Sequence, residues 1–180
     1  LAPEIFRDPG YLKILNVGCG LGTDTRWLLR QNAKQIVVTD ISYEFIHHTL
    51  KKFHSSENIM YGVVANGENL PFANNSFDMV FVSSVMHHIP HPLLFLKEAV
   101  RVAPIVVAVQ ESSDMAEFKH IVTALGLEKE YGNITTHRLN PNDIVRFLEM
   151  MEYDVRMKTD FIIFPYHLLR SFINNKTVVD

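Results

Sequence analysis

The chain has 180 residues, 47% of them hydrophobic and 21% charged, which is enough for one globular domain with a substantial core. Its 17 Lys and Arg residues are outnumbered by 20 Asp and Glu residues, and the resulting net charge of −3 argues against a general basic surface for nucleic acid. The single cysteine excludes an intrachain disulfide, and no apolar run approaches the roughly 20 residues of a membrane span.

These features favour a soluble cytoplasmic protein, and no secretory signal opens the chain. We expect residues 1–180 to form a single domain. The first residue is Leu1 rather than Met, which leaves open that a leading helical segment is missing. Arg26, Arg30 and Lys34 lie close in sequence and fit either a solvated helix face or a local basic patch. The composition does not indicate an oligomeric state.

Short apolar runs alternate with helix-like segments along the chain, which predicts an α/β fold. In chain order, the expected strands are residues 13–17, 35–40, 59–64, 77–83, 105–109 and 153–164, the last of which is either one strand or two with a break near Asp160. The expected helices are residues 23–31, 42–53, 92–102, 115–125, 140–151 and 166–174. Strands separated by helices predict a Rossmann-like, doubly wound, mostly parallel sheet flanked by helices. Such a sheet binds ligands at the carboxyl ends of its strands.

A glycine-rich loop, residues 18–22, follows the first expected strand and opens a helix. Glycines let the backbone turn tightly and approach a ligand closely, and the first helical turn adds free N–H groups. The glycines stand at positions 18, 20 and 22, whereas the dinucleotide fingerprint needs its third glycine where Thr23 stands. That spacing disfavours an NAD-linked dehydrogenase, and the absence of G-K-[ST] excludes a P-loop. A turn without any ligand remains the alternative.

Asp40 ends the second expected strand. A carboxylate at this place can accept hydrogen bonds from both hydroxyls of a ribose, as an adenosine-bearing cofactor requires. The alternative is that Asp40 merely starts the turn before Ser42, the expected helix N-cap.

Three stretches resemble the class I S-adenosylmethionine-dependent methyltransferases. Residues 14–22, Ile-Leu-Asn-Val-Gly-Cys-Gly-Leu-Gly, resemble the first motif of that family. Residues 68–72 and 75–78 resemble its E-x-L-P-F … S-F-D stretch, and residues 85–89 resemble the segment after its fourth strand. The nearest likeness is to the small-molecule branch that includes quinone-biosynthesis C-methyltransferases.

The resemblance implies methyl transfer from S-adenosylmethionine to a small-molecule acceptor, with S-adenosylhomocysteine as product and without a metal. Asp40 would bind the ribose hydroxyls, Ile41 would pack on the adenine, and Ser83 would lie by the methionine end. Asn66 and Gly67 would meet the adenine edge. The cofactor-binding residues that the resemblance implies are Asn16, Gly18, Cys19, Gly20, Gly22, Asp40, Ile41, Asn66, Gly67, Glu68 and Ser83.

Two asparagines depart from the family's pattern. The family usually has an acidic residue where Asn16 stands, near the cofactor's amino group, and often Asp where Asn66 stands, near the adenine amine. An amide oxygen can still accept, but a neutral acceptor gives roughly half the energy of a charged one, so the two changes together cost about 1–3 kcal/mol of binding free energy. A non-catalytic module that keeps the fold and binds the cofactor weakly or not at all therefore stays open.

His88 and His87 are the candidate catalytic residues, and His91 follows closely. An imidazole can remove the proton of an oxygen or carbon acceptor near neutral pH. His88 is the first choice, and the alternative is a loop contact that supports the cofactor pocket. The H-H-x-x-H spacing does not predict a metal site, because Pro90 and Pro92 break the helix that such sites need.

Residues 128–139 contain few apolar side chains, and we expect a loop over the strand edge. Tyr131, His137 and Arg138 in this loop could meet the acceptor or face solvent. Residues 166–172 carry an apolar face that could dock on the core, on another copy of the chain or over the substrate. The sequence identifies neither the acceptor nor the atom that is methylated.

Overall fold

The computed structural model describes residues 12–31, 33–54, 59–109, 129–130, 134–135 and 140–155. The chain divides into two compact units, residues 1–147 and 148–180, and residues 148–155 are the described part of the second. Within the described ranges, no helix combines the length and the apolar character that a membrane crossing requires.

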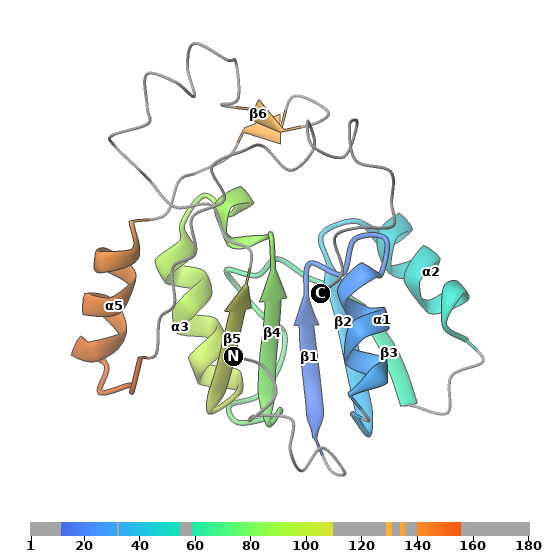
Figure 1. Ribbon diagram of the computed structural model, residues 1–180, viewed down its shortest axis with the longest axis horizontal. Helices are drawn as coiled ribbons and strands as arrows, with labels where there is room; N and C mark the ends of the chain where they lie inside the picture. Colours follow the sequence, from blue (N-terminus) through green and yellow to red (C-terminus); the bar gives the residue numbers. More distant parts are fainter. Residues whose placement is uncertain are drawn as a thin grey trace, which may run out of the picture. The chain divides into compact units, whose positions relative to one another are not determined.

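The first unit contains a five-stranded parallel sheet with the strand order β3-β2-β1-β4-β5 (Figure 1). Its strands are β1 (Lys13–Val17), β2 (Gln35–Asp40), β3 (Ile59–Val64), β4 (Met79–Ser83) and β5 (Ile105–Val109). Val17 pairs with Thr39 on one side and with Val82 on the other, so the carboxyl ends of the three central strands lie level. The strand order reverses at β1, which is where doubly wound sheets bind ligands. The predicted Rossmann-like parallel sheet is confirmed.

The helices of the first unit follow the strands closely. They are α1 (Thr23–Arg30), α2 (Tyr43–Lys52), the 3₁₀ turn η1 (Met86–His88), α3 (Pro92–Val102) and α5 (Pro141–Met150), which ends in the second unit. The Ser42 hydroxyl accepts from the Phe45 N–H at 3.3 Å, so the predicted N-cap of α2 is confirmed. Pro92 opens α3, where its missing N–H costs nothing.

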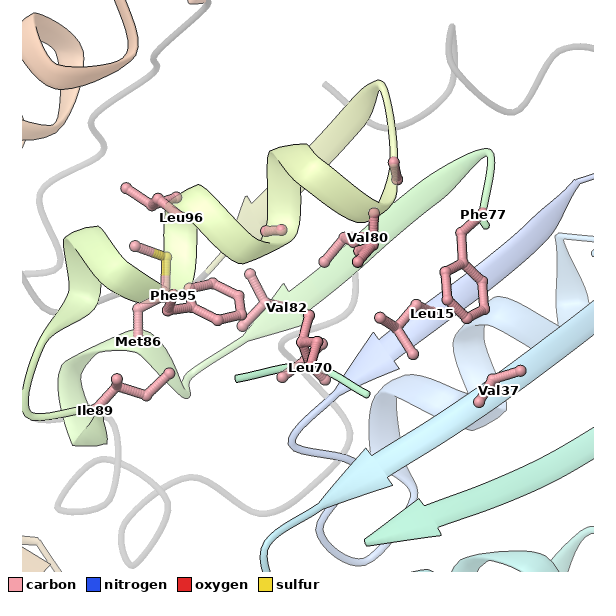
Figure 2. Packing of buried hydrophobic residues seen from close by; sticks show 14 residues of the cluster. Leu15, Val37, Leu70, Phe77, Val80, Val82, Met86, Ile89, Phe95 and Leu96 are labelled. Atoms are coloured by element: carbon pink, nitrogen blue, oxygen red, sulfur yellow. The ribbon is translucent and has the colours of Figure 1, made fainter. Parts of the chain in front are cut away.

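Alternate side chains of the strands build a separate hydrophobic cluster on each face of the sheet, because successive side chains point to opposite faces. On one face, β-strand residues pack against α3 (Figure 2); the cluster includes Leu15, Val37, Val80, Val82, Phe95 and Leu96. On the other face, strand residues pack against α1 and α2; this cluster includes Ile14, Ile36, Val38, Met79, Phe81, Leu28 and Ile46. The two clusters hold the loops at the carboxyl edge in fixed relative positions.

Two predicted strand boundaries are wrong. The strand expected at residues 77–83 begins at Met79, because the Phe77 N–H donates to the Val102 carbonyl at 3.1 Å and the Phe77 ring meets Phe72 edge-on. The strand expected from Tyr153 is absent over residues 153–155, the described part of that prediction. There Glu152 has a φ of 63° and the Tyr153 N–H donates to the Leu148 carbonyl at 3.0 Å, so a left-handed turn ends α5.

The loop expected at residues 128–139 contains two short antiparallel strands, β6 (Lys129–Glu130) and β7 (Ile134–Thr135). Such short local pairing leaves no apolar periodicity in the sequence, which is why the pattern predicted a loop. The helices expected at residues 115–125 and 166–174, and Tyr131, His137 and Arg138, lie outside the described residues.

Candidate cofactor and active site

The glycine loop after β1 is fixed by backbone hydrogen bonds. The N–H groups of Gly18 and Cys19 both donate to the Thr39 carbonyl of β2, at 2.8 and 2.9 Å. Gly18, Gly20 and Gly22 have φ angles of 71°, 46° and 78°, in the left-handed region that favours glycine. The three-glycine spacing therefore has a conformational cause as well as a possible binding role.

The loop is closed at both ends and open in the middle. A Cβ added at Gly18 would lie 2.3 Å from Cγ2 of Val85, and one added at Gly22 would lie 2.8 Å from Cε2 of Phe53. A Cβ added at Gly20 would meet no atom of the described residues within 4 Å. A ligand can therefore approach the backbone at Gly20, which fits the cofactor that the sequence resemblance implies.

Asp40 stands beside this opening, at the carboxyl end of β2, and its carboxylate is already oriented. Oδ2 accepts from the Gly20 N–H and Oδ1 accepts from the Ser42 N–H, each at 3.0 Å. Each carboxylate oxygen keeps a second lone pair, so both oxygens can still accept from the hydroxyls of a ribose. The next residue, Ile41, is 78% exposed and offers an apolar surface for a base.

The segment after β3 is held by side chains. Asn66 Oδ1 accepts from the Glu68 N–H at 2.9 Å and so forms a local turn. Glu68 Oε1 accepts from the His91 N–H at 2.8 Å and lies 3.2 Å from the His91 ring Nδ1. A Cβ at Gly67 would lie 3.0 Å from Cδ2 of Phe95 on α3. Glu68 therefore ties residues 66–68, which include the two residues predicted to meet the adenine, to the start of α3.

Sequence reasoning missed the group that holds residues 70–74. The Arg101 guanidinium donates to the carbonyls of Leu70 and Phe72 at 3.0 and 2.7 Å and forms an ion pair with Glu98 at 2.7 Å. Glu98 Oε2 also accepts from the Leu70 N–H at 2.9 Å. The hydrogen bonds from Arg101 lower the pKa of Glu98. This pair docks the E-x-L-P-F stretch on α3, and the acid–base spacing of three residues on one helix was the available signal.

Asn16 lies beneath the glycine loop rather than at its surface. Asn16 is 1% exposed, and its side-chain Nδ2 donates to Thr25 Oγ1 of α1 at 2.9 Å. The amide thus ties β1 to α1. The predicted position of Asn16 against the cofactor's amino group stays a prediction.

Ser83, the last residue of β4, is 6% exposed and hydrogen-bonds to the carboxylate of Asp24 in the first turn of α1. Burial raises the pKa of Asp24, and the hydrogen bond from Ser83 opposes that shift. Sequence reasoning predicted Ser83 but not Asp24. The acidic residue just after the glycine loop could have indicated this contact. It was not distinctive, because acidic residues are common in the first turn of a helix, where they interact favourably with the helix dipole.

The two predicted catalytic histidines form the end of η1, after β4. His87 is 1% exposed, whereas His88 is half-buried, and the two ring centroids lie 4.2 Å apart. His88 is therefore the better placed of the two to meet an acceptor, while His87 packs behind it. Their catalytic role stays a prediction. Within the described ranges, no group of three His, Cys, Asp or Glu side chains is placed to hold a metal ion.

Cys19 is a structural part of the loop. It is 2% exposed, and burial together with the nearby charge of Asp40 raises the pKa of its thiol to about 11. The thiol is therefore protonated at neutral pH and does not act as a nucleophile there.

Residues 15–104 match a protein family described as a methyltransferase domain. A ubiquinone/menaquinone biosynthesis C-methyltransferase from Rickettsia prowazekii is 35% identical over 98 residues, which are 49% of this chain and 39% of that protein. A tRNA U34 carboxymethyltransferase from Nautilia profundicola is 33% identical over 91 residues, 47% of this chain and 28% of that protein. The matched region thus covers less than half the length of these relatives.

Among solved structures, an S-adenosylmethionine-dependent methyltransferase from Methanosarcina mazei has a TM-score of 0.67, with 19% sequence identity over 87% of this chain and 87% of that one. At this identity the likeness shows the fold, and it agrees with the doubly wound sheet described above.

Proposed function

Because the chain belongs to the methyltransferase domain family, we propose that it binds S-adenosylmethionine at residues 18–22 and transfers its methyl group to a small-molecule acceptor. The observation that carries the proposal is the pairing of the open backbone at Gly20 with the oriented carboxylate of Asp40. Both lie at the carboxyl edge of the sheet, at the point where the strand order reverses.

In this proposal, the cofactor's parts are distributed along the edge of the sheet. Asp40 accepts from the ribose hydroxyls with the lone pairs that Gly20 and Ser42 leave free. Exposed Ile41 covers one face of the adenine, and residues 66–67 meet its edge. The loop itself passes under the methionine part.

S-adenosylmethionine, when bound, supplies a methyl group already activated on a sulfonium sulfur. The chain's own contribution is to bind, orient and exclude water. For an oxygen or carbon acceptor, His88 accepts the acceptor's proton at a ring nitrogen as the new methyl bond forms and the bond to sulfur breaks. His87, packed against His88 with ring centroids 4.2 Å apart, supports that ring.

A small-molecule acceptor is favoured over nucleic acid by the charge of the chain. Its net charge is −3, and binding to phosphate backbones draws most of its affinity from Lys and Arg. The quinone-biosynthesis relative acts in small-molecule metabolism according to its name. The other relative is named as a tRNA-modifying enzyme, so RNA is the alternative acceptor that an experiment must include.

Two experiments test the proposal. Calorimetric titration with S-adenosylmethionine, S-adenosylhomocysteine and NAD should give binding of the first two and not of the third; the reverse pattern would contradict the cofactor assignment. Transfer of a labelled methyl group to a panel of phenols and quinone precursors, and in parallel to unmodified tRNA, then tests the acceptor. Label in the small-molecule fraction is expected. Label in tRNA would mean that the acceptor is RNA rather than a small molecule. Cofactor binding without any methyl transfer would indicate a non-catalytic module.

A further inference from the structure

The outer sides of helices α1 and α2 form one surface. Both helices cover the same face of the sheet, since Leu28 of α1 and Ile46 of α2 belong to one hydrophobic cluster (Figure 1). They are joined at the glycine loop, where Nζ of Lys52, the last residue of α2, donates to the Leu21 carbonyl at 2.7 Å. We call the exposed side chains of residues 21–34 and 43–54 the α1–α2 face.

The exposed charges of the α1–α2 face are almost all of one sign. Its exposed cationic residues are Arg26, Arg30, Lys34, Lys51 and Lys52. Among the described residues of this face, Glu44 is the one exposed carboxylate, and it accepts from the Ser42 hydroxyl at 2.7 Å. Within the described ranges, Arg26, Arg30 and Lys51 form no ion pair. In a chain with a net charge of −3, this local excess of cations creates a face that attracts polyanions.

The dipoles of the two helices do not account for all of these cations. Arg30, Lys51 and Lys52 lie in last turns, where a positive charge is favourable. Arg26 lies in the middle of α1, four residues before Arg30, so the two exposed guanidinium groups are neighbours on the helix surface. Like charges at this spacing destabilise a helix. An anionic partner on the α1–α2 face would remove that repulsion.

Exposed apolar side chains lie among the cations. Leu21 is 58% exposed, and its carbonyl accepts the hydrogen bond from Lys52. Phe45 is 42% exposed and lies seven residues before Lys52, nearly two helical turns, so both are on the same side of α2. The α1–α2 face therefore offers apolar and cationic groups to the same partner.

This combination fits an anionic bilayer surface better than it fits other polyanions. An interfacial protein surface inserts apolar side chains at the level of the headgroups, while its Lys and Arg residues attract anionic lipids. An RNA backbone binds cations but has no contact to offer an aliphatic side chain such as Leu21. Interfaces between proteins are depleted in Lys, whereas three of the five exposed cations here are Lys.

We propose that the α1–α2 face docks the chain on a membrane surface that contains anionic phospholipid. Leu21 and Phe45 lie in the lipid interface, and the surrounding Lys and Arg side chains bind the headgroups. Docking requires no cofactor, so this proposal and the proposed methyl transfer can fail independently.

Co-sedimentation of the full 180-residue chain with lipid vesicles tests the proposal. The wild-type chain should bind vesicles of mixed phosphatidylserine and phosphatidylcholine, and not vesicles of phosphatidylcholine alone. Lys51→Glu should weaken binding about fivefold or more, because each Lys near an anionic surface contributes roughly that factor. Lys97→Glu is the matched control: it changes the net charge equally at an exposed position of α3, on the opposite face of the sheet, and should stay within about twofold.

Phe45→Ala separates a lipid surface from other polyanions, because it keeps every charge. It should weaken vesicle binding about threefold, since part of an aromatic side chain no longer enters the interface. Fluorescence anisotropy with labelled tRNA is measured in parallel, and no binding is expected at the concentrations at which vesicles bind. Circular dichroism checks the fold of each variant. If Lys51→Glu does not fold, Lys51→Gln and Lys97→Gln are compared in the same way.

Equal losses for the Lys51 and Lys97 variants, or wild-type binding that does not depend on phosphatidylserine, would overturn the proposal. Vesicle binding that Phe45→Ala leaves unchanged would also overturn it, because the apolar side chains would then lie outside the interface. Binding of tRNA that Lys51→Glu abolishes, without binding of vesicles, would assign the α1–α2 face to nucleic acid instead.

Discussion

Two regions of the first unit are held in different ways. At the β1–β2 edge, residues 18–22 and 39–42, backbone N–H groups bond to the Thr39 carbonyl and to the Asp40 carboxylate. In the β3–β4 region, the segments that follow these two strands (residues 66–74 and 83–91), side chains do this work. Glu68 joins the two segments, and the Glu98–Arg101 pair holds residues 70–74, where the chain runs toward the start of β4. The β1–β2 edge therefore depends mainly on backbone donors, and the β3–β4 region depends on charged side chains.

This difference has a consequence for function. The β1–β2 edge has its shape before a ligand arrives, which reduces the ordering that binding requires. The β3–β4 region depends on single side chains that bond to the backbone, so exchanging one of them should alter its shape more readily.

The largest expected effect comes from Gly20→Val. A β-branched side chain is strained at a φ of 46°, and it would occupy the open space in which the cofactor is proposed to lie. We expect a folded chain with no measurable binding of S-adenosylhomocysteine by calorimetry. Gly18→Ala is the contrasting variant: its Cβ would lie 2.3 Å from Val85, so it should lower the melting temperature. Normal binding by a stable Gly20→Val chain would mean that the loop is only a turn.

Asp40→Ala should weaken binding of S-adenosylhomocysteine about tenfold or more, because two hydrogen bonds to a carboxylate are worth about 1.5–3 kcal/mol. The same variant also frees the N–H groups of Gly20 and Ser42. Asp40→Asn, which keeps one acceptor, is therefore measured beside it and should lose less. Calorimetry gives the affinities, and circular dichroism checks the fold. An unchanged dissociation constant in the folded alanine variant would remove Asp40 from the ribose site.

Arg101→Ala tests the β3–β4 region. It removes the donors to the Leu70 and Phe72 carbonyls and the partner of Glu98, so the free energy of unfolding should fall by about 2–3 kcal/mol in urea titrations. Arg101→Lys, which cannot make the two-pronged contact, should recover only part of that loss. Binding of S-adenosylhomocysteine should stay within about threefold. A loss of affinity well beyond threefold in a folded Arg101→Ala chain would show that the β1–β2 edge depends on the β3–β4 region.

Asn66→Asp should have the smallest effect. A carboxylate can still accept from the Glu68 N–H and adds a charged acceptor beside the proposed adenine amine, so affinity for S-adenosylhomocysteine should rise several-fold, by roughly 1 kcal/mol. Asn16→Asp is a different case, because the Asn16 side chain is buried against Thr25 beneath the loop. A charge there would act on the cofactor only across the glycine loop. A fall in affinity for Asn66→Asp would mean that the amide N–H groups are part of the site.

The parts of the molecule that could be predicted from the sequence are those with local causes. Apolar runs predicted the strands, Ser42 predicted the cap of α2, and the glycine spacing predicted a tight loop that the left-handed φ angles explain. The contacts that were not predicted join residues far apart in the chain, such as His91 with Glu68 and Asp24 with Ser83. Such pairs leave no periodic pattern, because they depend on which loops the sheet order brings together.

A crystal structure of the complex with S-adenosylhomocysteine is the most direct test of the central claim, that the β1–β2 edge is the cofactor site. We expect the ribose hydroxyls within hydrogen-bond distance of both Asp40 oxygens, the adenine against Ile41 and the sulfur above Gly20. A ligand bound at another edge of the sheet, or a ribose that leaves the Asp40 carboxylate without a hydroxyl partner, would contradict it.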